Sequence, residues 1–106
     1  MDDTLDELSY DLEENGVLVR RDIGRKVLRR GPWSTVLFLY EELDRETLTW
    51  RPAKIAVVRF QKWRGSYRKH SSFQLSSEAE AKELLDVIVD WLPRLAPRDD
   101  AVPSEE

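Results

Sequence analysis

The chain has 106 residues, of which 36% are charged, and a formal net charge of −4 at pH 7. This length predicts one domain with a single modest core. Cysteine is absent, which excludes disulfides, a thiolate nucleophile and a thiolate metal site. No apolar run approaches the length of a transmembrane helix, and the first residues are acidic rather than those of a signal peptide. We therefore expect a soluble cytoplasmic protein, nucleoid-associated if it is bacterial.

The charges are distributed unevenly along the chain. Residues 1–15 hold seven acids and no base, residues 16–75 hold fourteen bases and five acids, and residues 76–106 hold three bases and nine acids. A positive middle between acidic ends is typical of a body that binds a polyanion, with flanks that limit nonspecific association. Solvated sheet faces also carry Lys and Arg for structural reasons alone, so the charge does not decide the function by itself.

The first fifteen residues form a separate acidic segment. Leu5, Leu8 and Leu12 have helical spacing, which leaves open a short helix docked on the body, but the composition favours a flexible segment. The body is expected over residues 16–95. Residues 96–106 read as a flexible acidic tail, because Pro97 begins a polar stretch.

The body begins with β-type sequence. Residues 17–30 form two short runs around Gly24, either a small hairpin or one long bulged strand, and they are the densest basic region. Gly31 and Pro32 break the chain before Trp33. Residues 34–41 are apolar at nearly every position, which predicts a strand that is central in its sheet or has an aromatic binding face. Residues 42–52 are expected to be a loop.

Residues 54–75 read as a β-hairpin with a tight turn at Gly65-Ser66, since glycine first suits a type II′ turn. This turn sets Trp63 opposite Arg68 and Val58 opposite Phe73. Opposed residues share a face. One face then carries the apolar residues Ala56, Val58, Phe60, Phe73 and Leu75. The other carries a polar and basic set behind Ile55 and Val57: Arg59, Gln61, Trp63, Arg68, His70, Ser72 and Gln74.

A helix follows the hairpin. Ser77 and Glu80 match a capping box at its start, and Pro93 is expected to end or kink it. Its apolar residues recur at three- and four-residue steps. The predicted fold is α+β, with a single curved antiparallel sheet of four strands, or five, followed by one C-terminal amphipathic helix (ββββα). The helix is expected to cover one face of the sheet and to leave the basic face open.

Catalysis has little support in the sequence. His70 is the only histidine, and its neighbours are Lys69 and Ser71 rather than a carboxylate. The acids lie in tails, a loop and the helix, where none is paired for acid–base chemistry. There is no phosphate-binding glycine loop and no metal-ligand spacing. We expect a protein that is not an enzyme, with no cofactor, no metal, no small-molecule substrate and no membrane contact.

Basic residues interleaved with aromatic ones suit single-stranded nucleic acid, because cations bind phosphates and unpaired bases stack on rings. Trp63 opposite Arg68 is such a pair, although an exposed Trp–Arg contact also occurs as ordinary surface packing. The candidate nucleic-acid-binding residues come from the basic run, the strand openings and the polar face of the hairpin: Arg29, Arg30, Trp33, Lys54, Arg59, Gln61, Trp63, Arg68 and His70.

An ordered set of short motifs resembles a known family. Gly31-Pro32-Trp33 leads into the apolar strand, Arg51-Pro52-Ala53-Lys54 opens the strand that holds Arg59, and Phe73-Gln74-Leu75-Ser76 precedes Glu80 and the Leu84-Leu85 helix. With the strand order, this set is similar to the single-stranded-DNA-binding domain of transcriptional positive cofactor four, and more closely to its short bacterial relatives. The resemblance covers residues 17–95. The hairpin end and the longer acidic N-terminal segment depart from the family pattern.

The resemblance implies a homodimer whose curved sheets form a channel for single-stranded DNA. It assigns basic binding roles to Lys54, Arg59 and Arg68, and aromatic roles to Trp33 and Trp63. The helix residues Ile88, Trp91, Leu92 and Leu95 are the candidate dimer contacts, since one helix cannot bury them and also cover a sheet. We expect sequence-tolerant binding of single-stranded DNA, with RNA left open, in transcription regulation or DNA maintenance. The alternative is a dimeric protein-interaction module that binds no nucleic acid.

Overall fold

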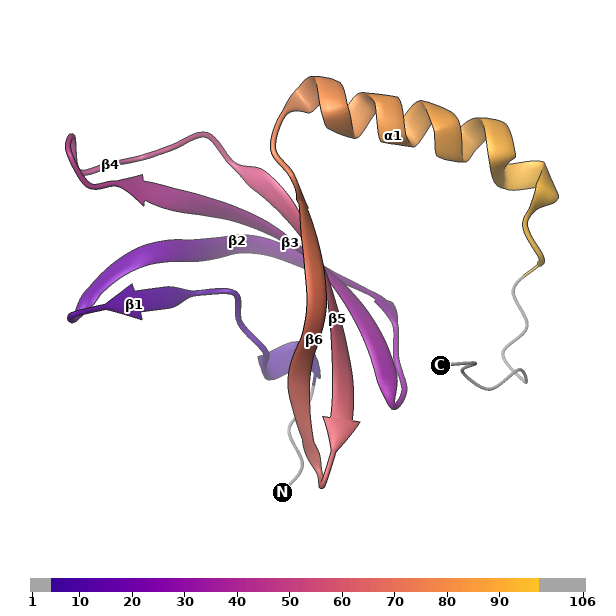
Figure 1. The fold of residues 1–106 in the computed structure, drawn as a ribbon, viewed down its shortest axis with the longest axis horizontal. Helices are drawn as coiled ribbons and strands as arrows, with labels where there is room; N and C mark the ends of the chain where they lie inside the picture. The colour runs from indigo at the N-terminus through magenta and orange to yellow at the C-terminus, as the bar shows by residue number, and fades with distance from the viewer. Residues whose placement is uncertain (1–4, 98–106) are drawn as a thin grey trace.

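The computed structural model describes residues 5–97. A short 3-10 helix, η1 (Leu5–Glu7), is followed by six strands, one α-helix and a final 3-10 turn. The strands are β1 (Leu12–Glu14), β2 (Val17–Arg29), β3 (Trp33–Asp44), β4 (Thr49–Trp50), β5 (Lys54–Trp63) and β6 (Ser66–Leu75). The helix is α1 (Glu78–Trp91), and the turn is η2 (Leu92–Arg94). Figure 1 shows a curved sheet with α1 extending from one end of it.

The strands form one antiparallel sheet in the order β1-β2-β3-β5-β6, with β4 paired to the end of β3. Within residues 5–97 the predicted curved antiparallel sheet and C-terminal helix are confirmed, but the sheet does not have four strands: five follow one another across it, and β4 is a sixth. The two additional strands, β1 and β4, are short. Asn15 and Gly16 join β1 to β2 with positive φ angles of 53° and 79°, the conformation of a type I′ hairpin turn.

The basic run at residues 17–29 is one long strand rather than a small hairpin. β2 pairs with β3 from Arg20 to Arg29, and the register shifts between Asp22 and Gly24 and again between Val27 and Arg29. Ile23 and Leu28 lie at these bulges and are 50% and 54% exposed. The bulges let a strand of 13 residues bend with the curved sheet without breaking.

Alternate residues of β3 and β5 build the core. We call the side of the sheet to which they point the covered face, and it consists of Ser34, Val36, Phe38, Tyr40, Ala56, Val58 and Phe60, all buried. The Ser34 hydroxyl donates to the Gly31 carbonyl at 2.7 Å. Burial, together with the neighbouring Tyr10, raises the pKa of the Tyr40 phenol. The alternation of apolar residues thus produces a dry face, as expected for strands.

The acidic N-terminal segment covers this face. Leu5 and Tyr10 are only 3% and 5% exposed and belong to the core cluster, with Leu8 packed against it. The Tyr10 ring stacks on Phe38 at 5.4 Å between centroids and meets Tyr40 edge-on at 4.9 Å. The expectation that residues 1–15 are flexible therefore differs from the structure over residues 5–14. Residues 1–4 lie outside the described residues.

Side chains of β2 hold this segment in place. Arg20 Nε donates to the Tyr10 carbonyl at 2.7 Å, and Arg25 Nη2 donates to the carbonyls of Leu5 and Leu8. Asp22 Oδ2 accepts from the Tyr10 backbone N–H at 2.6 Å. Two cations of the densest basic region, Arg20 and Arg25, thus bind the N-terminal segment to the sheet.

The β5–β6 hairpin turns one residue earlier than predicted. Arg64 and Gly65 form the turn, with φ angles of 53° and 82°, and Trp63 pairs with Ser66. These angles fit a type I′ rather than a type II′ turn. Gln61 pairs with Arg68, but the register shifts beyond Arg59, so that Val57, not Val58, pairs with Phe73.

Because of this bulge, residues in the second half of β6 lie on the faces opposite to those predicted. Phe73 points away from the core and is 53% exposed, and Leu75 shares its side because it pairs with Ile55. Gln74 points to the covered face, where its Nε2 donates to the Tyr10 hydroxyl at 3.0 Å. Ser72, which pairs with Val58, also lies on the covered face.

The helix begins as predicted but does not cover the sheet. Ser77 Oγ accepts from the Glu80 backbone N–H at 3.1 Å, and Glu80 Oε1 accepts from the N–H of Ser76 at 2.9 Å. α1 ends at Trp91, and Pro93 lies in the 3-10 turn that follows. No residue of α1 is buried, and the helix stands away from the sheet in Figure 1. Residues 98–106 of the expected tail lie outside the described residues.

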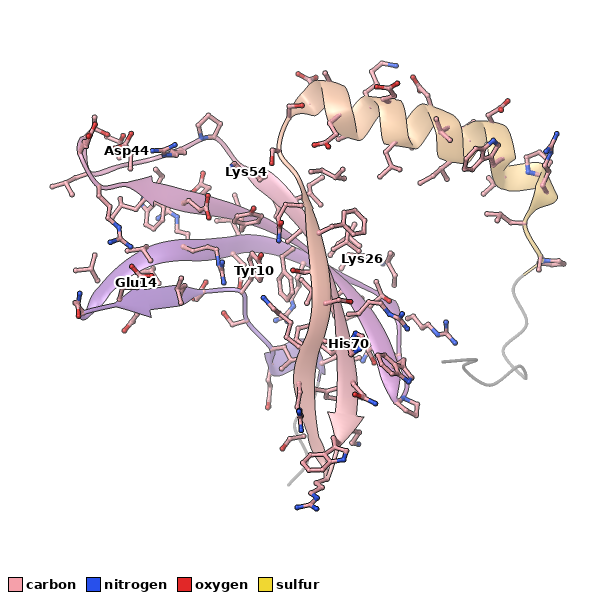
Figure 2. All side chains as sticks on the ribbon, viewed as in Figure 1. Tyr10, Glu14, Lys26, Asp44, Lys54 and His70 are labelled. Atoms are coloured by element: carbon pink, nitrogen blue, oxygen red, sulfur yellow. The ribbon has the colours of Figure 1, made fainter. Side chains whose placement is uncertain are left out.

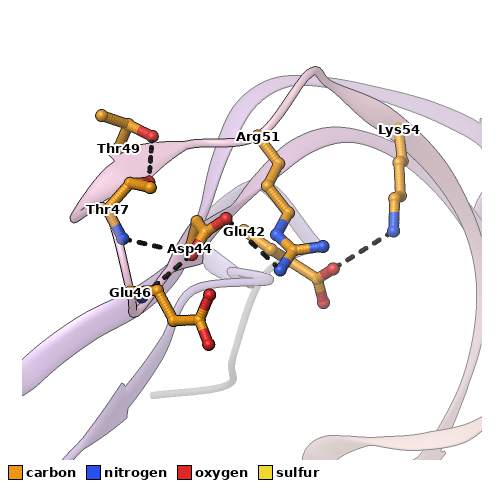
Figure 3. Close-up of polar contacts among 7 residues, drawn as sticks. All are labelled: Glu42, Asp44, Glu46, Thr47, Thr49, Arg51 and Lys54. Carbon is orange, nitrogen blue, oxygen red and sulfur yellow. Dashed lines mark hydrogen bonds and ion pairs between the residues drawn. The ribbon is translucent and has the colours of Figure 1, made fainter.

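The predicted loop over residues 42–52 contains a tight polar turn, shown in Figure 3. Asp44 Oδ1 accepts from the backbone N–H groups of Glu46 and Thr47 at 2.9 and 3.3 Å. These two bonds, with Arg51 nearby, lower the pKa of the Asp44 carboxyl. No helix within residues 5–97 has the length and apolar character needed to cross a membrane.

Candidate nucleic-acid interface

The side of the sheet opposite the core is the open face. Strand pairing places on it alternate residues of β3, β5 and β6, together with Lys26 and Arg29 of β2. These residues are half-buried or exposed, in contrast to the covered face. Figure 2 shows Tyr10 to the left of β6 and Lys26 to its right, on the side over which α1 extends. The helix and the open face therefore belong to the same side of the molecule.

The open face has two halves of different chemistry. The half nearest α1 is apolar and consists of Leu37, Leu39, Ile55, Val57, Phe73 and Leu75. The half nearest the β5–β6 turn is basic and aromatic, and we call it the basic–aromatic cluster: Arg29, Trp33, Arg59, Gln61, Trp63, Arg64, Arg68 and His70. The polarity thus changes along the strands, not across them.

Trp33 lies at the centre of the cluster. The Arg59 guanidinium lies 4.8 Å from the centroid of the Trp33 ring, and the His70 ring meets that ring edge-on at 4.7 Å. Trp33 pairs with Gln61 across the β3–β5 ladder. Two predicted site residues, Arg59 of β5 and His70 of β6, are thereby brought into direct contact with the indole ring of Trp33 on β3.

A second aromatic centre lies at the turn. Trp63 is 47% exposed, and the guanidinium carbons of Arg64 and Arg68 lie 4.2 and 4.7 Å from its ring centroid. Because Trp33 pairs with Gln61 near the start of β3, residues 62–67 extend beyond the first paired residue of β3. Trp63 therefore offers an accessible ring with two cations beside it.

Two rows of paired residues run across the strands through the cluster. Arg29 pairs with Thr35, which pairs with Arg59, so the two arginines are two strands apart on one face. Trp33, Gln61 and Arg68 form the next row. At about 4.8 Å between strands, each row spans roughly 10 Å. This arrangement places guanidiniums on both sides of the aromatic rings.

Acidic residues are absent from the segments that form this half of the sheet. Residues 23–40 and 55–77 contain nine Lys or Arg and no Asp or Glu. At the opposite end of the sheet, by contrast, Arg21, Arg45, Arg51 and Lys54 form ion pairs with Glu41, Glu14, Asp44 and Glu42. The positive charge of the middle of the chain is therefore concentrated around the cluster.

Two predicted residues lie outside the core of the cluster. Lys54 points to the same side as Tyr40 and Ala56, at the other end of β5, and its Nζ lies 3.3 Å from Glu42 Oε1 (Figure 3). Arg30 is exposed and follows the last residue of β2. Of the nine predicted residues, Lys54 is thus the one that strand geometry places on the wrong face.

The sequence interpretation missed two cations of the open face. Lys26 pairs with Leu37 and lies beside the cluster. Its face could not be predicted from simple strand alternation, because the bulges in β2 interrupt that alternation. The predicted turn at Gly65-Ser66 leaves Arg64 in a strand, whereas Arg64 lies in the observed turn. Glycine at the second turn position is the signal that indicates a type I′ turn there, because that turn needs positive φ at both positions.

The arrangement offers groups that can bind phosphates and bases. Guanidiniums donate charge-assisted hydrogen bonds to phosphate oxygens. Accessible indole rings provide stacking platforms for unpaired bases, each contact worth roughly 1–3 kcal/mol. Gln61 adds an amide that can donate to and accept from a base or sugar. Searches against family models, curated proteins and solved structures found no match, so the resemblance to the positive cofactor four family stays a prediction.

Proposed function

We propose that this protein binds single-stranded DNA with little sequence preference, through the basic–aromatic cluster of its open face. The observation that carries the proposal is the contact of Arg59 and His70 with Trp33, and of Arg64 and Arg68 with Trp63, on one accessible surface. Rings next to guanidiniums provide the two contacts that single strands need, stacking and phosphate neutralisation. Single-stranded RNA offers the same two groups and is the alternative ligand.

The composition of the cluster favours tolerance of sequence. Indole rings stack on every base, and guanidiniums bind a backbone that is the same at each nucleotide. The resemblance to the positive cofactor four family supports a coactivator-like role in transcription regulation or DNA maintenance. It also supports a cytoplasmic, nucleoid-associated location in a bacterium.

The deciding experiment is a titration of labelled oligonucleotides, single-stranded DNA, single-stranded RNA and duplex, at two salt concentrations. We expect single strands to bind more tightly than duplex and to weaken as salt rises, with a slope of about −0.7 in log K for each neutralised phosphate. Arg59→Ala should weaken binding. Lys54→Ala is the matched control, since it removes a cation from the same strand on the opposite face. Equal effects of both substitutions, or binding indifferent to salt, would contradict the assignment.

We also propose that the protein is a homodimer in which α1 and the apolar half of the open face pack against a second copy. The helix and the 3-10 turn that follows it, with the residue after the turn, expose seven large apolar side chains at 38–60%: Leu84, Leu85, Ile88, Val89, Trp91, Leu92 and Leu95. Leu39 and Phe73 on the open face are 40% and 53% exposed. Together their exposed apolar area is on the order of several hundred Å², the size of the largest apolar patch on a typical monomer, which is often functional.

A second copy fits this surface because both halves of the contact belong to one side of the same chain. An isologous contact then pairs the helix of each copy with the sheet of the other. Light scattering at micromolar concentration should give the mass of a dimer. Ile88→Glu should give a monomer, whereas Lys82→Glu, a charge change at an exposed position of the same helix, should not. A monomeric wild-type protein would refute the arrangement.

The exposed apolar surface also favours the alternative function, a protein-interaction module that binds no nucleic acid. The two functions differ in which half of the open face is used. Two results together would favour the interaction module: a dimer that does not bind single strands at low salt, and no effect of Arg59→Ala on the function of the protein.

A further inference from the structure

The sheet divides into two ribbons at the end away from the basic–aromatic cluster. Arg20 and Glu42 are the last pair that joins β2 to β3, and beyond them the start of β2 pairs with β1 and the end of β3 pairs with β4. Figure 1 shows the β1–β2 and β3–β4 ribbons separating at the left of the sheet. We propose that the cleft between these ribbons binds an extended peptide segment of a partner protein. Such binding does not depend on the proposed function, since it uses neither the cluster nor α1.

The cleft has the size of a binding site. Its volume is about 530 Å³, and ligand sites typically occupy roughly 300–1,000 Å³. Part of the lining is apolar, because Val19 is buried and Leu43 is half-buried. Both ribbons therefore contribute to one hollow large enough for several residues of an extended chain.

The two ribbons present strand edges to this cleft. Continued pairing of β2 with β3 would join Val19 to Leu43 and Leu18 to Asp44, but no such pair forms within residues 5–97. The carbonyl of Asp44 accepts from the Leu48 N–H at 2.7 Å, within the turn that leads to β4 and not across the cleft. An unpaired strand edge offers N–H and C=O groups with which another strand can pair. A peptide added as a strand would use these groups, the mode of recognition known as β-augmentation.

The charges around the cleft are nearly balanced, with three arginines and four acids in its lining. Arg45 Nη2 contacts Glu14 Oε1, and Arg51 Nη2 lies 3.6 Å from Asp44 Oδ2. A ligand of one charge sign gains little here, because each charge that it meets already has a partner of its own sign. A peptide brings backbone amides for the strand edges and side chains of both signs for the rim, so its chemistry fits the whole lining.

One wall of the cleft is held in place before any ligand binds. Asp44 Oδ1 accepts from the N–H groups of Glu46 and Thr47, and the hydroxyls of Thr47 and Thr49 lie 2.7 Å apart (Figure 3). A preformed wall lowers the cost of ordering a bound chain. The mouth is easier to change, since the pair that joins the ribbons, Arg45 and Glu14, has side chains 62% and 45% exposed. Exposed ion pairs contribute little to stability, so a peptide can separate this one.

The cleft and the cluster lie at opposite ends of β3. Trp33 of the cluster is the first residue of this 12-residue strand, and Asp44 of the cleft is the last. At about 3.3 Å per residue the two sites are up to about 35 Å apart. A peptide and a single strand can therefore be bound at the same time, which would let the protein bring a partner to nucleic acid.

The test closes the cleft with a covalent bridge in the full-length protein. Because the chain has no cysteine, Glu14→Cys with Arg45→Cys places one thiol on each ribbon, and a short bis-maleimide joins the two. The matched control is the same double variant with both thiols capped by N-ethylmaleimide, which leaves the cleft open. The probe is a phage-displayed library of random decapeptides, selected on the wild-type protein. We expect selected peptides to bind the wild type and the capped variant alike, and the bridged variant at least about tenfold more weakly.

A second measurement uses the wild-type protein alone. Proline at the central position of a selected peptide should remove binding, because proline has no N–H for the ladder. Equal binding to the bridged and capped proteins, or a library that yields no binder, overturns the proposal. So does a fall of the oligomeric mass on bridging, which would assign the cleft to a second copy. Single-stranded DNA should bind both forms equally; if it binds neither while the peptides do, the proposed function fails and the peptide site stands.

Discussion

Truncation of Tyr10 tests the finding that an acidic N-terminal segment completes the core. The ring is 5% exposed, stacks on Phe38 and meets Tyr40 edge-on, and Arg20 lies 3.9 Å from its centroid. Removing a buried aromatic ring costs about 3–5 kcal/mol, because the transfer free energy and the cavity add. Tyr10→Ala should therefore destabilise the protein as much as truncation of a residue in a central strand.

Tyr10→Phe separates the ring from the hydroxyl. It keeps both aromatic contacts and removes the acceptor of the Gln74 amide, 3.0 Å away. Since Gln74 is exposed, water replaces the lost partner, and we expect a cost below about 1 kcal/mol. Leu12→Ala is the control within the same segment, because Leu12 is 38% exposed in the short strand β1.

Urea denaturation at one fixed protein concentration measures the three variants, since a dimer makes apparent stability depend on concentration. At about 4–8 °C for each kcal/mol, Tyr10→Ala should also lower the thermal midpoint by more than about 12 °C. A change within about 0.5 kcal/mol, the range of ordinary surface substitutions, would show that the segment does not contribute to the core.

Four further predictions follow from the same geometry. Phe60→Ala should cost about 3–5 kcal/mol of stability in urea denaturation, whereas Phe73→Ala should leave the fold intact and raise the dimer dissociation constant in sedimentation. Trp63→Ala should weaken single-strand binding by roughly 1–3 kcal/mol in a titration without changing the salt slope, since the indole neutralises no phosphate. Arg64→Asn should raise the free energy of unfolding, recovering part of the roughly 1–2 kcal/mol that left-handed backbone costs most residues. The pKa of Asp44 is lowered, so its ionised form stabilises the fold at pH values above the ordinary pKa of Asp, and this stability is lost as the pH falls through the folded-state pKa. Asp44→Asn should therefore make the free energy of unfolding depend less on pH in the acid range, in denaturation curves measured across pH.

The hairpin shows how far strand alternation predicts a face. The predicted turn at Gly65-Ser66 and the observed turn at Arg64-Gly65 both pair odd-numbered residues of β5 with even-numbered residues of β6. Trp63 and Arg68 were therefore assigned to the correct common face although the turn was wrong. Beyond the bulge at His70 the parity reverses, and Phe73 lies on the opposite face from the one predicted. A bulge of this kind depends on the curvature of the whole sheet and has no clear local signal.

The N-terminal segment shows a different limit. Its acids predict a solvated chain, and local sequence contains no information about which sheet face is left uncovered. The helix was assigned to that face because its apolar stripe needs a contact, but the stripe does not specify the contact. Asn15-Gly16 was the available signal: a type I′ hairpin there makes residues 12–14 a strand, which carries the preceding residues back over the sheet.

The open face changes its chemistry along the strands in a way that core packing does not require. Along β5 the covered-face positions Ala56, Val58 and Phe60 stay apolar, because the N-terminal segment packs over them. The positions between them change from Ile55 and Val57 near the helix to Arg59, Gln61 and Trp63 near the turn. A face that only had to be solvated would be polar throughout, and a face that only joined a partner would be apolar throughout. The change along one strand therefore fits two surfaces on one sheet, an apolar one for a second copy and a basic–aromatic one for a single strand, and the predicted effects of Phe73→Ala and Trp63→Ala should separate accordingly.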